Sequence, residues 1–286
     1  RKRDLDLVFV LADAEERGND ISEEQRAKNA ANVDRALMRF EFVQAVVRIA
    51  IAKHVKSGAT QSVAKATERL ITESILPRVP REALHDSDVF RRSRLYTREV
   101  HEVFAVHNAS LSALYEAFAN ANKSNNVRDT QAETRAKDKV MDLGEWDMLL
   151  NMAQLIDDDF TRRQAALCFV WSQAFCTDDM KRRIVLTHLS YVDFLEALAR
   201  ITTFRPLPTQ ALLKSTGSRS PEHFYMLATA GLHKGKQQLR KVAWYEEEES
   251  TATLAEPLRI LLELIVERFD TAGAGVLTVK EIQKRL

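Results

Sequence analysis

Residues 189–194 read Leu-Ser-Tyr-Val-Asp-Phe, and the same order of residue types recurs at residues 37–42, 141–146 and 277–282. The shared pattern is one apolar residue, three intervening residues, then an acid followed at once by a large apolar residue. Apolar residues continue at helical spacing after three of the copies, as Phe42, Val46 and Ile49, as Trp146, Leu149 and Ala153, and as Phe194, Leu198 and Ile201. The sequence therefore predicts that a helix runs on from each of these acids.

The fourth copy follows an apolar-striped segment, residues 258–269, which we expect to be a helix. Between that helix and the last acid lies a twelve-residue loop, residues 270–281. Asp270 stands at loop position 1, Gly275 at position 6 and Glu281 at position 12. This layout resembles an EF-hand, and the four copies resemble the second halves of such units. The resemblance implies helix–loop–helix units that bind partner helices in an apolar groove.

The ligand set of the resemblance is incomplete. Calcium takes about six to eight oxygen ligands, and positions 3 and 5 normally supply side-chain oxygens. Here those positions are Ala272 and Ala274. Asp270, Thr278 and Glu281 are left as the candidate metal ligands, with one backbone carbonyl. We therefore expect weak calcium binding or none.

The earlier copies are poorer still as calcium loops, because each places a cation where a turn or a ligand is needed. Arg35 and Lys139 stand at the glycine position of the first and second copies, and Arg182 stands at position 1 of the third. A divalent cation is repelled by such groups. No cofactor is expected beyond this weak calcium candidate.

Composition favours an all-α fold. Of 286 residues only eight are glycine and six are proline, below the usual proportions of about 7% and 5%. Few turns point to long helices, and we expect any strand to be a two- or three-residue pairing near Met141 and Leu189. The predicted fold is a tandem of degenerate EF-hand-like units, the last of them isolated.

Four regions are predicted. Residues 1–110 form an N-terminal helical region with the first unit. Residues 111–201 form a paired lobe, in which we expect Asp157–Asp159 to cap a helix over residues 160–175. The pattern dissolves over residues 202–257, which reads as a linker. Residues 258–286 form the C-terminal unit.

Composition also excludes several partners. The formal net charge is +1, whereas nucleic-acid-binding domains carry a marked basic excess. No apolar run approaches the roughly eighteen residues of a membrane span. Cys168 and Cys176 lie on one predicted helix, too far apart along its axis for a disulfide, and indicate a reduced intracellular protein. We expect neither nucleic acid nor membrane as a partner.

No catalytic motif or metal-binding cysteine pattern is present, so we expect no enzyme. Trp244 and Tyr245 lie in the predicted linker and are either partner-binding anchors or buried against a neighbouring helix. The acidic run Glu246–Glu249 is either a contact for a basic partner or a solvated run.

Three functions remain open. The first is a structural scaffold that binds other proteins, similar to EF-hand-like proteins of ciliary and flagellar axonemes; Phe90–Tyr96 and Tyr191–Leu198 carry that resemblance. It implies a cytoplasmic, cytoskeletal location on microtubules, with tubulin or axonemal proteins as partners. The second is a calcium sensor that uses the Asp270–Glu281 loop. The third is an enzyme whose all-α site leaves no motif.

Overall fold

The computed structural model describes residues 8–10, 12, 39–119, 139–176, 183–239, 253–270 and 273–286. Over these ranges the chain is mostly helical, and its strands are two short segments, β1 (Met141–Asp142) and β2 (His188–Leu189). The predicted all-α class is confirmed. None of the helices in these ranges combines the length and apolarity that a membrane crossing requires.

The chain divides into two compact units, which we describe separately. Unit 1 comprises Arg1–His85 and Cys176–Leu186, and unit 2 comprises Asp86–Phe175 and Thr187–Leu286. This division differs from the predicted boundaries near residues 110, 201 and 257. The difference arises because helices from all three of the later predicted regions share one core.

The main described part of unit 1 is built around two helices that each end in a π-helical turn. Its elements are α3 (Arg39–Ala50), η1 (Ile51–Val55), α4 (Val63–Leu70), η2 (Ile71–Ile75), η3 (Leu76–Arg78) and η4 (Arg81–Leu84), while α10 (Arg183–Thr187) lies at the boundary. Ser62 begins α4 as its cap, because its hydroxyl accepts a hydrogen bond from the Lys65 N–H.

The core formed by the described residues of unit 1 is small. Ala50, Ala66 and Leu70 are buried, and Val46, Ile49, Val55 and Ile75 pack around them. Val46 and Ile49 therefore face inward as the stripe predicts. Phe42 does not: it is 59% exposed, together with the nearby Phe40 and Val43, because α4 covers the later part of α3.

Unit 2 contains the two longest helices among the described residues. Its elements are α5 (Ser87–Phe90), η5 (Arg91–Leu95), α6 (Arg98–Phe118), α8 (Leu143–Met152), α9 (Arg162–Ser172), α11 (Tyr191–Ile201), α12 (Gln210–Ser215), α13 (Pro221–Thr229), η7 (Gly235–Gln238), α15 (Ala255–Phe269) and α16 (Val279–Gln283), with β1 and β2. Thr97 caps helix α6, because its hydroxyl accepts a hydrogen bond from the Val100 N–H. The helix then runs unbroken for 21 residues.

The two strands join the connection before α8 to the connection before α11. They pair antiparallel, with Met141 opposite Leu189 and Asp142 opposite His188. The prediction of a short pairing at these residues is confirmed. The Tyr115 hydroxyl of α6 reaches both connections, at 2.6 Å from the Lys139 carbonyl and 2.9 Å from the Leu189 carbonyl.

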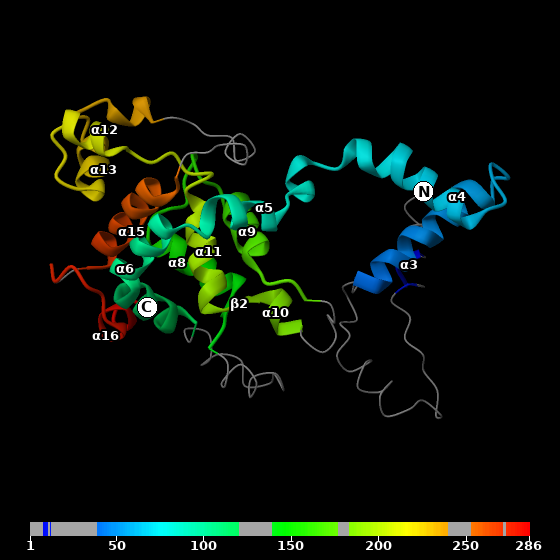
Figure 1. Ribbon diagram of the computed structural model, residues 1–286, viewed down its shortest axis with the longest axis horizontal. Helices are drawn as coiled ribbons and strands as arrows, with labels where there is room; N and C mark the ends of the chain where they lie inside the picture. Colours follow the sequence, from blue (N-terminus) through cyan, green and yellow to red (C-terminus); the bar gives the residue numbers. More distant parts are fainter. Residues whose placement is uncertain are drawn as a thin grey trace. The chain divides into compact units, whose positions relative to one another are not determined.

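The core of unit 2 lies where α6, α8, α9, α11 and α15 pack together (Figure 1). Trp146 and Phe194 meet edge to face at 6.2 Å, and Phe118 meets Phe269 at 5.9 Å. All four side chains are fully buried. The stripes that follow the second and third copies of the repeat are buried at every predicted position, so those core predictions are confirmed.

The predicted linker is wrong over residues 202–239. Helices α12 and α13 form there, and α13 packs against α15. Leu213, Phe224 and Tyr225 belong to the main core. Ser220 caps α13 and Pro221 takes its first position, where a proline is well tolerated.

The prediction of an isolated C-terminal unit is also wrong. Both α15 and α16 pack against α6. Phe269 and Ile282 lie in the shared core, and the Leu277 N–H donates to the Ser110 hydroxyl of α6 at 3.1 Å. A single helix pair leaves its apolar face uncovered, and here α6 covers it.

Two local predictions fail between residues 157 and 176. Thr161 caps α9, not the aspartate run; Asp157 closes a turn and pairs with Arg205 at 2.9 Å. Neither Cys168 nor Cys176 forms a disulfide, and both are buried, but α9 ends at Ser172, so they do not share a helix. Burial raises the pKa of the Cys168 thiol well above its usual range.

Candidate docking site

The acids of three repeat copies serve the helices that they begin. In each, the residue three positions earlier accepts a hydrogen bond from the backbone N–H of the acid, and the acid accepts one from that residue's N–H. The pairs are Asp142 with Glu145, Ser190 with Asp193, and Thr278 with Glu281. Such reciprocal capping satisfies two backbone donors that a helix start otherwise leaves open. The repeat is thus a helix-start signal in these copies.

The first copy contributes differently. Glu41 is buried in α3, which the structure describes from Arg39. The residues before Arg39 that an EF-hand loop would include lie outside the described ranges.

The last loop adopts a tight turn around Asp270. Its two carboxylate oxygens accept from the N–H groups of Ala274, at 3.1 Å, and Gly275, at 2.6 Å. Gly275 has a φ of +73°, which suits glycine. At the other end of the loop the Glu281 carboxylate accepts from the Thr278 N–H and hydroxyl, at 3.1 and 2.7 Å.

The candidate metal ligands Asp270, Thr278 and Glu281 are accompanied by alanine at two of the usual ligand positions. Across the ranges that the structure describes, no three His, Cys, Asp or Glu side chains gather closely enough to hold a metal ion. The loop residues therefore do not fit a calcium ion with the usual ligand number.

A surface pocket lies in unit 2 between the α5–η5 segment, residues 87–95, which we call the strap, and the start of α11. Its volume is about 580 Å³, and its apolar lining comes from Tyr96, Ala174, Phe175 and Val192. Phe175 is 80% exposed, Tyr96 67% and Val192 66%. We call it the α5–α11 pocket. Large apolar side chains gathered on a surface commonly mark an interaction site.

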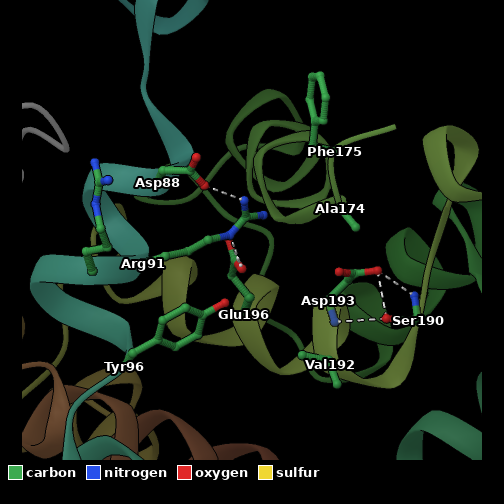
Figure 2. Close-up of a pocket in the computed structure, with 10 residues that line it drawn as sticks. Asp88, Arg91, Tyr96, Ala174, Phe175, Ser190, Val192, Asp193 and Glu196 are labelled. Carbon is green, nitrogen blue, oxygen red and sulfur yellow. Dashed lines mark hydrogen bonds and ion pairs between the residues drawn. The ribbon is translucent and has the colours of Figure 1, made fainter. Parts of the chain in front are cut away.

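The polar wall of the pocket is an ion-pair network (Figure 2). The Arg91 guanidinium binds Glu196 at 2.8 Å and Asp88 at 3.1 Å, and Glu196 also binds Arg200 at 2.7 Å. Arg200 lies against the ring of Phe90, with 4.2 Å from its guanidinium carbon to the ring centre. The network joins the strap to α11, so these two sides of the pocket are held together.

The network also sets the charges of its arginines. Burial alone would lower the pKa of Arg91, but the hydrogen bond and charge of Glu196 outweigh it, and the pKa lies above its usual value. Burial lowers the pKa of Arg200, although Glu196 opposes that effect.

Two further charged groups line the pocket. The Asp193 carboxylate is turned back onto Ser190, at 2.9 Å from its N–H and 2.7 Å from its hydroxyl (Figure 2). Arg92 is exposed, and it forms no ion pair or hydrogen bond with any part of the chain that the structure describes.

The predicted partner-binding residues Trp244 and Tyr245 lie outside the described residues, as does the acidic run after them. The α5–α11 pocket was not predicted from sequence. Two stretches quoted for the axonemal resemblance, Phe90–Tyr96 and Tyr191–Leu198, do supply most of its lining. The ion pair that joins the two stretches, Arg91 with Glu196, links residues 105 positions apart, which one sequence does not reveal.

Comparison with known proteins identifies no relative. No protein-family model matches the chain, and searches of curated proteins and of solved structures find no significant match.

Proposed function

We propose that this chain is a non-enzymatic docking protein whose helix–loop–helix frame, of degenerate EF-hand type, holds partner proteins in a larger assembly. One observation carries the proposal: the repeated acids are used to cap helices. A frame that is closed by its own hydrogen bonds keeps one geometry without a cation, and a fixed geometry suits a docking surface.

Two features support the docking role further. The short β1–β2 pairing links the two loops of residues 111–201, an arrangement similar to that of paired EF-hands. Exposed apolar side chains gather at the α5–α11 pocket. The assembly that we propose is microtubule-based, of the ciliary or flagellar axoneme, with tubulin or an axonemal protein as partner. This last step rests on the sequence resemblance alone.

Co-sedimentation with stabilised microtubules tests the assembly. The full chain should appear in the pellet at about 100 mM salt and decline as salt rises, because exposed charged contacts are screened. A chain that stays in the supernatant at every salt concentration contradicts the microtubule part of the proposal. Bovine serum albumin, run in parallel, reports trapping in the pellet.

A calcium sensor is the second candidate, favoured by the geometry around Asp270. Its carboxylate accepts from the N–H groups at loop positions 5 and 6, which closes the turn that a calcium loop needs. Isothermal titration of the full chain with calcium decides between the two. Heat of binding at micromolar calcium, lost in Glu281→Gln, supports the sensor; no heat up to millimolar calcium supports the docking protein.

A further inference from the structure

We propose that the α5–α11 pocket binds a peptide segment of another protein, one in which a large apolar side chain stands beside an acidic residue. The inference rests on the proposed docking function and names the partner's chemistry. The apolar part follows from the lining. Phe175, Tyr96 and Val192 keep most of their surface in water, and an apolar side chain that covers them removes that surface from solvent.

The acidic part follows from the charges around the pocket. Its carboxylates already have partners: Asp88 is bound by Arg91, and Glu196 by Arg91 and Arg200. The Asp193 carboxylate is hydrogen-bonded at the N-terminus of α11, where the helix field offsets its charge.

Arg92 is the lining charge that remains. Among the described residues it has no carboxylate partner, and it is exposed beside the apolar lining. An arginine in that position is complementary to a carboxylate on an incoming peptide. A basic peptide would meet Arg92 with the same sign of charge, and would gain little from carboxylates that are already bound.

The hydrogen bonds of Arg91 hold the pocket in one shape before a peptide binds. Arg91 also donates to the carbonyls of Ser172 and Gln173, at 3.4 and 3.2 Å. The strap, the end of α9 and the first turns of α11 are thus fixed to one another. A partner that docks on a preformed surface loses less free energy to ordering than one that must shape it.

Selection from a phage library of random twelve-residue peptides tests the proposal on the full chain. The recovered peptides should carry Phe, Trp, Leu or Ile within three positions of Asp or Glu. Synthetic copies should bind Phe175→Ala about tenfold more weakly, as expected for an aromatic anchor. Arg92→Glu should weaken them about as much, and selection on Arg92→Glu should recover Lys or Arg in place of the acid.

Two control variants lie outside the pocket. Val106→Ala removes an apolar side chain that is 80% exposed, and Arg219→Glu reverses an exposed arginine; each should change affinity by less than about twofold. Circular dichroism of every variant checks folding. The proposed role of the pocket is contradicted if the recovered peptides lack the apolar–acidic pair. It is also contradicted if they bind both pocket variants as tightly as the native chain. Neither result contradicts the docking function. Recovery of no peptide also overturns the pocket, and microtubule co-sedimentation then reports on the function separately.

Discussion

Unit 1 and unit 2 are both helical, yet they bury very different cores. Among the residues that the structure describes, the α3–α4 pair of unit 1 encloses Ala50, Ala66 and Leu70, while Phe40 and Phe42 remain exposed. In unit 2 five helices enclose Trp146, Phe194 and many other side chains. Since stabilisation follows the apolar area removed from water, unit 2 should hold the greater share of the stability. Helical content alone does not say where a chain is stable.

The largest effect should come from Phe194→Ala. The side chain is fully buried and its ring lies 5.4 Å from that of Tyr115 and 6.2 Å from that of Trp146. Removing it should cost about 3–5 kcal/mol of unfolding free energy, as for other buried aromatic residues. Urea denaturation measures this. The matched change in unit 1, Phe42→Ala, should cost less than about 0.5 kcal/mol; equal losses would remove the contrast between the units.

Glu196→Gln should have the next largest effect. It keeps the size of the side chain but removes the negative charge that offsets the buried Arg200. The expected loss is about 2–3 kcal/mol, because the charge remains in a poorly solvated place. Glu73→Gln alters an ion pair with Arg69 in unit 1 whose side chains are half exposed, and should cost less than about 0.5 kcal/mol. Similar values for the two would show that burial does not govern these pairs.

Ser62→Ala probes unit 1 directly. Loss of the cap at α4 should cost about 1 kcal/mol, and in a unit with so small a core that loss should appear as faster local opening. Hydrogen exchange should speed up about fivefold for α4 amides and remain unchanged for those of α11. Uniform acceleration across both helices would mean that the two units open together.

The smallest effect on stability should be that of Asp157→Asn, and it should depend on pH. Burial alone would raise the pKa of Asp157, but the hydrogen bond and charge of Arg205 outweigh it and lower the pKa. A carboxyl with a lowered folded-state pKa stabilises the fold above its unfolded value, near 3.9, and loses that contribution as the pH falls through the folded value. Asp157→Asn should therefore lower the Tm at pH 7, and the gap to the native chain should close below about pH 4. A gap that persists at pH 2 would contradict this.

Sequence reasoning succeeded where a short pattern contains the whole physical cause. The acids at Glu145, Asp193 and Glu281 sit three residues after a capping side chain, so residues close in sequence decide the helix start. The apolar stripe that follows decides which side of the helix is buried. Pairing of Met141 with Leu189 also followed, because both residues precede such a start.

It failed where neighbours distant in sequence decide the outcome. Helix α12 has six residues, too few turns for a periodic pattern to stand out. The core role of α13 follows from its packing against α15. The sequence suggested Asp157–Asp159 as the cap of the following helix. The cap is formed by Thr161, which makes a complete capping box with Gln164. The candidate site depends on Arg91 meeting Glu196 across 105 positions, and nothing local in the sequence marks that contact.

The alkylation rates of the two buried thiols would report how often each unit opens. Cys168 belongs to unit 2 and Cys176 to unit 1. A thiol reagent attacks the thiolate of an accessible cysteine, so each residue can be modified only while its surroundings are open. With a maleimide at pH 7, Cys176 should be alkylated well before Cys168, and mass spectrometry of the digested chain would read both rates from a single sample. The ratio of those rates would measure how differently the two units open under native conditions.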